Sequence, residues 1–134
     1  MLVLFVVLAQ KCDGTSQNST GAKYRAIEEL WAAVPTYPGS TEVDRGWKSQ
    51  DTIAYLSKSF NCRVSLGDLG SFYLKGLPDN GWQFTGQKPV TRWFRSTGGQ
   101  ALTFRKGDYQ LDLEYAPEEL KYGWTYAILI SWNG

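Results

Sequence analysis

The sequence predicts one α+β domain, in which two helices cover one face of an antiparallel sheet of about five to seven strands. Two segments, 22–34 and 65–77, have apolar residues at helical spacing. Almost all of the chain after residue 82 has the alternation and turn signals of consecutive strands. Aromatic residues make up 15% of the 134 residues, which suits a protein rich in sheet.

The first nine residues, MLVLFVVLA, are continuously apolar. They are too few to cross a bilayer as a helix, which takes about 20 residues, but they match the apolar region of an export signal. A buried N-terminal strand is the alternative. Residues 10–21 are polar and small, as in a flexible tether. We therefore expect a signal-like segment at 1–9, a tether at 10–21 and a single domain at 22–134.

The first predicted helix, 22–34, is amphipathic. Its apolar stripe consists of Tyr24, Ile27, Leu30, Trp31 and Val34. Pro35 ends the helix, since the residue before a proline is disfavoured in the α region. Two prolines and a glycine then make 35–40 a rigid turn.

Two strands, 41–47 and 51–60, are predicted next, and the second is apolar on both faces. Ser65 is in position to cap the helix at 65–77, with Asp68 three residues later. The run Pro-Asp-Asn-Gly at 78–81 ends this helix. The remaining predicted strands are 82–85, 90–96, 100–105, 108–115 and 124–132, with a tight hairpin at Lys106-Gly107.

Two passages resemble small exported bacterial proteins, lipoprotein-like and without an assigned function. Pro-Thr-Tyr-Pro-Gly-Ser at 35–40 is similar to their P-x-Y-P-G-[AS] turn. Phe-Tyr-Leu-Lys-Gly-Leu at 72–77, with Gly81-Trp82, is similar to their F-Y-x-x-x-L…G-W helix exit. The resemblance covers residues 34–115. It implies a small α+β domain behind an export or lipoprotein signal, and it assigns no functional residue.

The two cysteines leave three alternatives open. An apolar stretch, Cys12 and a polar tether resemble a bacterial lipoprotein, in which that cysteine is acylated and tethers the protein to a membrane; here Lys11 stands where such signals carry a small residue. A Cys12–Cys62 disulfide would suit an oxidising compartment. Two free thiols would suit the cytoplasm.

Composition excludes several classes of function. The chain has no histidine, so His-based triads and zinc sites are ruled out. A formal net charge of +1 does not favour a nucleic-acid binder. No cofactor or metal is expected.

The best candidate for ligand binding is a basic and aromatic cluster, consisting of Arg92, Trp93, Arg95 and Arg105. On a strand at 90–96, Trp93 and Arg95 would share one face. An arginine beside a tryptophan can hold an anionic or sugar ligand. Packing of one aromatic ring in the core, with the arginine stems lying over it, is the alternative.

Asp112 and Glu114 lie two residues apart on the polar face of a predicted strand, as a carboxylate pair for hydrolysis would. A solvated strand face is the simpler interpretation. We therefore expect an exported periplasmic or membrane-anchored module that binds another envelope component and is not an enzyme. A periplasmic small-ligand binder and a histidine-free hydrolase are the alternatives.

Overall fold

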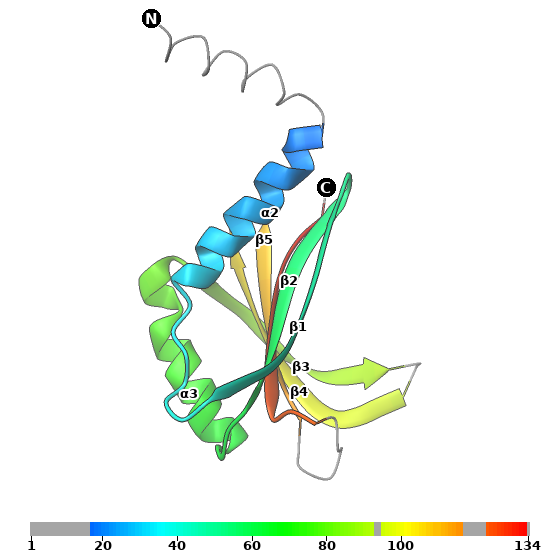
Figure 1. Cartoon of the computed structure of the whole chain (residues 1–134). Coiled ribbons are helices and arrows are strands. Elements are labelled where there is room, and N and C mark those ends of the chain that lie inside the picture. Colours follow the sequence, from blue (N-terminus) through cyan, green and yellow to red (C-terminus); the bar gives the residue numbers. More distant parts are fainter. Residues whose placement is uncertain (1–16, 93–94, 117–122, 134) are drawn as a thin grey trace, which may run out of the picture.

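The computed structural model describes residues 17–92, 95–116 and 123–133. Within them lie two α-helices, a short 3₁₀ helix and six strands (Figure 1). In chain order these are α2 (Gln17–Ala32), β1 (Thr41–Gln50), β2 (Ile53–Asn61), α3 (Leu66–Gly76), η1 (Pro78–Asn80), β3 (Gln83–Arg92), β4 (Arg95–Lys106), β5 (Tyr109–Tyr115) and β6 (Tyr126–Asn133). No helix in these ranges is long and apolar enough to span a membrane.

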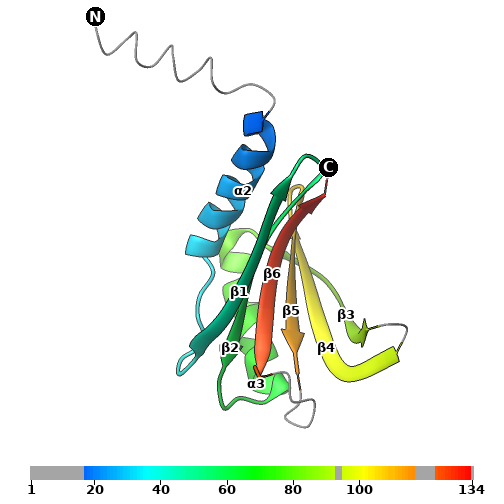
Figure 2. The same cartoon turned by 45° about the vertical axis from the view of Figure 1, so that its right-hand side comes forward.

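The strands form one antiparallel sheet in the order β1-β2-β6-β5-β4-β3. Both helices pack on the same face of this sheet, and the opposite face carries no helix (Figures 1 and 2). The predicted two-layer α+β architecture is therefore confirmed.

The core lies between the sheet and the helices. Trp31 of α2 is 7% exposed, and its Nε1 donates to the Leu56 carbonyl oxygen at 2.9 Å, which fixes the helix on β2. On α3, a Cβ at Gly70 would lie 3.4 Å from Leu102, so this glycine brings the helix close to β4. The fully buried large side chains are Tyr73, Tyr126, Phe104, Ile27, Leu69, Leu77, Leu111, Leu113, Ile128 and Ile130.

The helix α2 differs from the predicted segment at both ends. It begins at Gln17, so residues 17–21 are helical and do not belong to a tether. These residues are polar and lie outside the apolar stripe, so hydrophobic spacing does not mark the true start. The α-helix ends at Ala32, and the amides of Ala33 and Val34 then bond three residues back, to Leu30 and Trp31, in a tightened last turn.

The helix α3 confirms the predicted helix within a residue at each end. Its cap is Ser65, whose Oγ accepts a hydrogen bond from the Asp68 amide at 3.1 Å. After η1, Gly81 takes a φ of 89°, a conformation that favours glycine.

The Pro-Thr-Tyr-Pro-Gly-Ser turn joins α2 to β1 and is held by aromatic residues. The Tyr73 hydroxyl donates to the Pro35 carbonyl oxygen at 2.8 Å, and the Ser40 and Tyr126 hydroxyls lie 2.6 Å apart. The Tyr37 ring meets the Phe72 ring edge-on, with centroids 5.1 Å apart. This motif therefore has a structural role, as expected from its composition.

The predicted strand at 90–96 is wrong. Instead, β3 continues through Gly86 and Pro89 to Arg92, and the chain reverses so that Arg92 lies opposite Arg95 of β4. An edge strand tolerates proline, and register shifts after Phe84 and after Pro89 accommodate the irregularity. The end of this hairpin projects away from the helices (Figure 1).

The other predicted strands are confirmed with small changes of boundary. β1 extends to Gln50, beyond the predicted end at residue 47. The hairpin therefore turns at Asp51-Thr52, and β2 begins at Ile53. The hairpin at Lys106-Gly107 is present, with Gly107 at a φ of 59°.

Candidate functional site

Among the described residues, no helix lies on the face of the sheet opposite α2 and α3. The strand register places its side chains in three cross-strand rows. On the four inner strands these residues are Tyr55, Ser57 and Ser59 of β2, Ala127, Leu129 and Ser131 of β6, Gln110, Asp112 and Glu114 of β5, and Ala101, Thr103 and Arg105 of β4. We call this set the helix-free face.

Its central part is hollowed. A depression of about 250 Å³ is lined by Tyr55, Ser57, Glu114, Ala127 and Leu129, which come from β2, β5 and β6. Small-molecule sites usually enclose roughly 300–1,000 Å³ and bury most of the ligand. This depression is smaller, and its size suits one large side chain of a partner.

Small side chains let this depression form. Ala127 is only 8% exposed although no helix covers it, and neither it nor Ala101, 2% exposed, belongs to the main core. Tyr55 and Leu129, which also line the depression, are half-buried. The small Ala127 therefore leaves space between larger side chains of the neighbouring rows.

A series of hydrogen bonds between polar side chains crosses the N-terminal end of β5 on the same face. The Arg105 guanidinium donates to Gln110 Oε1 at 3.3 Å, and the Gln110 amide nitrogen donates to the Asp112 carboxylate at 3.0 and 3.2 Å. Arg105 and Asp112 are thus joined through Gln110. Beside them, the Thr85 and Thr103 hydroxyls lie 2.7 Å apart. These hydrogen bonds link side chains from β3, β4 and β5 on one side of the sheet.

The structure does not bring the four cluster residues together. Arg105 is ten residues from Arg95 along β4, about 30 Å at ordinary strand rise. Arg92 and Arg95 are paired through their backbones, but their side chains, and Trp93 entirely, lie outside the described residues. The expected sharing of a strand face by Trp93 and Arg95 falls on side chains outside the described residues and stays a prediction. Of the four, Arg105 alone is placed here, on the helix-free face.

The two carboxylates lie where the alternation predicted, in adjacent rows of one face. Asp112 is bonded to Gln110, as described above, and Glu114 lines the depression. Among the described residues there is no group of three His, Cys, Asp or Glu side chains able to hold a metal ion.

Cys62 is a free thiol in the structure. Its Sγ lies 3.7 Å from the Pro38 carbonyl oxygen, beside the turn that follows α2. Cys12 lies outside the described residues, so acylation and disulfide pairing both stay predictions.

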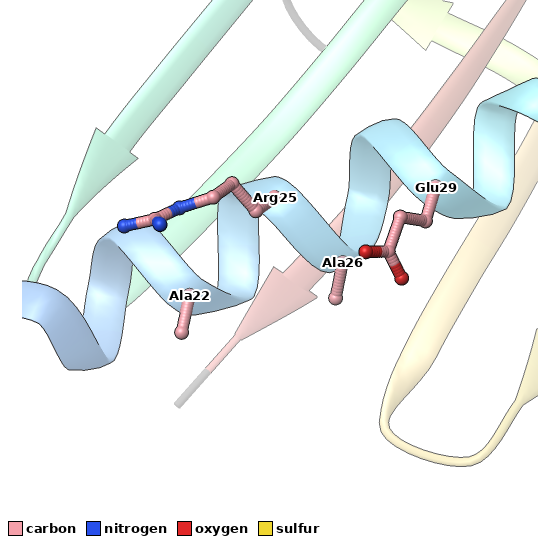
Figure 3. Close-up of a pocket in the computed structure, with 4 residues that line it drawn as sticks. All are labelled: Ala22, Arg25, Ala26 and Glu29. Carbon is pink, nitrogen blue, oxygen red and sulfur yellow. The ribbon is translucent and has the colours of Figure 1, made fainter. Parts of the chain in front are cut away.

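A second hollowed region, which the sequence did not indicate, follows the outer side of α2. A depression of about 380 Å³ is lined by Ala22, Arg25, Ala26 and Glu29 of this one helix (Figure 3). A neighbouring depression of about 470 Å³ shares Ala26 and Glu29 and reaches the β4–β5 turn at residues 106–109. Two segments far apart in sequence form it, so no local pattern could have revealed it.

The Arg25 side chain does not cover the depression on α2. It runs along α2 toward the N-terminal end, where Nε donates to the Gly21 carbonyl oxygen at 3.4 Å (Figure 3). The first of these depressions is lined by residues of a single helix, two alanines and two charged side chains, so it offers a ligand contacts from one element only. The helix-free face, built from four strands with ordered polar groups, is the stronger candidate.

Comparison with known proteins adds no further assignment. The chain matched no protein-family model, no curated protein and no solved structure.

Proposed function

We propose that this chain is a protein-binding module, and that the helix-free face is its contact surface. The single observation that carries the proposal is the depression that Tyr55, Ser57, Ala127 and Leu129 line together with the carboxylate-bearing Glu114, at the centre of a four-strand surface. Its lining is largely apolar, so we assign it an aliphatic or aromatic side chain of the partner protein.

Size and shape support a protein partner. A protein contact usually covers about 800 Å² on each side and has a buried anchor surrounded by polar groups. The helix-free face has this arrangement, with the depression at its centre and the chain of Arg105, Gln110 and Asp112 beside it.

The proposal assigns binding and no reaction. Within the described ranges, several polar side chains of this face are hydrogen-bonded: Arg105 to Gln110, Gln110 to Asp112, and Thr103 to Thr85 of the adjacent β3. Such a pattern orders a surface, whereas catalysis by attack on a substrate needs a nucleophile bonded to a base.

The setting that we propose is outside the cytoplasm, in the cell envelope of a bacterium. This part rests on the apolar segment 1–9, Cys12 and the resemblance to exported bacterial domains. The partner would then be another envelope protein. Fractionation of cells, followed by mass spectrometry of the N-terminal peptide, would test the location separately from the binding.

A photo-crosslinking amino acid at position 57 tests the contact surface in the organism that encodes the chain. Position 71, exposed on α3, is the matched control. We expect one protein to be captured at 57 and not at 71. That protein is then purified, and its affinity for Ser57→Arg and Ser71→Arg variants is measured by calorimetry.

The expected result is at least about a tenfold loss of affinity for Ser57→Arg, because the long side chain fills the depression, and no change for Ser71→Arg. Equal melting temperatures would show that both variants are folded. Capture that is equal at both positions, or an affinity unchanged by Ser57→Arg, would exclude the helix-free face as the binding surface.

A further inference from the structure

The outer strand β1 has features of a surface that pairs with another strand. It lies at one edge of the sheet, where β2 is its only partner among the described strands. Its Trp47 is 63% exposed and Val43 is 44% exposed, the two most exposed large apolar side chains in the described ranges. An edge strand with apolar groups of this size readily adds another strand.

The two edges of the sheet are not equivalent. At the other edge, β3 contains Pro89, which has no N–H, and two register shifts. In β1 the single shift falls between Glu42 and Asp44, and the register from Asp44 to Gln50 is regular over seven residues. A regular β1 edge can therefore extend the sheet, whereas β3 is poorly suited to do so.

Charges along β1 are divided between its halves. Glu42 and Asp44 lie in the first half, and Arg45 and Lys48 follow them, with Gly46 between the two basic residues. The register with β2 places Asp44 and Lys48 toward the helix-free face, and Arg45 and Trp47 toward the helices. An antiparallel copy of this strand would bring acidic residues opposite basic ones.

We propose that two copies of this chain associate through antiparallel pairing of their β1 strands, with Gly46 at the twofold axis. In this register Asp44 of each copy lies opposite Lys48 of the other, and Arg45 lies opposite Trp47. The first pair joins opposite charges, and the second places a guanidinium beside an indole ring. The six-stranded sheets then form one continuous sheet of twelve strands.

Other registers are less favourable. Centring the axis on Arg45 pairs Glu42 with Lys48 but places two arginines directly opposite each other. Centring it on Trp47 places Asp44 opposite Gln50 and Lys48 opposite Gly46. Directly opposed like charges destabilise a strand pair, and unpaired charges add nothing. The charge pattern therefore selects the register centred on Gly46 and disfavours pairing with unrelated strands.

The backbone of β1 is free to make these bonds. The Arg45 amide donates to its neighbour's carboxylate, Asp44 Oδ1, at 2.9 Å and not to β2. This hydrogen bond covers a donor of the outer edge in the single chain. In the dimer the Asp44 carboxylate turns to Lys48 of the second copy, and the Arg45 amide bonds across the new interface.

The inference is independent of the proposed function, because it uses the sheet edge and not the helix-free face. Sedimentation equilibrium of the full chain, from about 10 µM to about 1 mM, measures the dimerisation constant. Three variants are compared with the parent: Lys48→Asp, Asp44→Lys, and the double exchange Asp44→Lys with Lys48→Asp. Both sites, Asp44 and Lys48, are exposed edge positions, and thermal melts check that the variants fold.

We expect each single change to weaken dimerisation about tenfold, because two symmetry-related pairs become repulsive together. The double exchange restores opposite charges at both pairs and should return the constant to near the parent value. Higher salt should weaken the parent dimer. A chain that stays monomeric at 1 mM, a dimer unmoved by the single changes, or a double exchange that fails to rescue would each overturn the proposal.

Discussion

Two buried phenols should make this protein lose stability above pH 10. Tyr73 is 1% exposed and donates to the Pro35 carbonyl oxygen, and Tyr126 is fully buried beside Ser40. Burial, reinforced by the neighbouring Tyr126, raises the pKa of Tyr73 far above its ordinary value. Burial also raises the pKa of Tyr126, although hydrogen bonding to Ser40 opposes the shift.

The direction of the effect follows from the proton balance. In the unfolded chain a tyrosine has a pKa of about 10. Below that pH both states keep the proton, and the contribution of the buried phenol to stability is complete. As the pH rises toward the higher pKa of the folded state, only the unfolded chain loses its proton. Each such tyrosine then lowers the free energy of unfolding by about 1.4 kcal/mol per pH unit.

The variant Tyr73→Phe separates two consequences of this arrangement. At pH 8 this substitution should lower the free energy of unfolding by about 1–2 kcal/mol, since the Pro35 carbonyl oxygen loses its hydrogen-bond donor. Between pH 10 and 11 the parent should lose about 1 kcal/mol more stability than this variant, because the variant has no phenol at position 73 to ionise on unfolding.

Denaturant unfolding, followed by fluorescence at half-unit steps from pH 8 to 11, measures both quantities. Tyr55→Phe removes a phenol from a half-buried site on the helix-free face and is the control for the substitution itself. If Tyr73→Phe had the same alkaline slope as the parent, the Tyr73 hydroxyl would be ionising within the folded protein, and the reasoning from burial would be wrong.

Two further changes test the local structure of α3 by denaturant unfolding. Gly81→Ala should lower the free energy of unfolding more than Gly39→Ala does. Both glycines have a φ near 90°, but a Cβ at position 81 would also lie 3.1 Å from Lys106, whereas position 39 is open. Equal losses would mean that backbone strain alone sets the effect. Ser65→Ala should cost about 1 kcal/mol, because the Asp68 amide loses its acceptor, and Ser65→Asp should retain most of the stability. An Ala variant as stable as the parent would show that water replaces the cap.

Features set by near neighbours in the chain could be predicted. Ser65 caps a helix through an amide three residues away, and Gly107 supplies the φ that a tight hairpin requires. The alternation from Tyr109 to Tyr115 identifies the buried face of β5, where Leu111 and Leu113 are 0% and 1% exposed. In each case the cause and its effect lie within one turn or one strand.

Features set by distant parts of the chain could not be predicted from the sequence. Gly86 and Pro89 indicate a break, but β3 is an edge strand and tolerates both residues, which only the strand order reveals. The depression on the helix-free face has the same origin. Ser57, Glu114 and Leu129 are unremarkable along the sequence, and they meet only because β6 lies between β2 and β5.

The position of β6 also decides when this protein can fold. β6 pairs with β2 on one side and β5 on the other, and the paired residues of β2 and β6 are 66 to 80 positions apart in sequence. Until residues 126–133 leave the ribosome, the β1–β2 hairpin and the β3–β4–β5 unit have no strand to join them. Closure of the sheet is therefore a late event dominated by long-range contacts, which are slow to form. The β1–β2 hairpin and the β3–β4–β5 unit can each form from local contacts, but they become one sheet only when β6 lies between them.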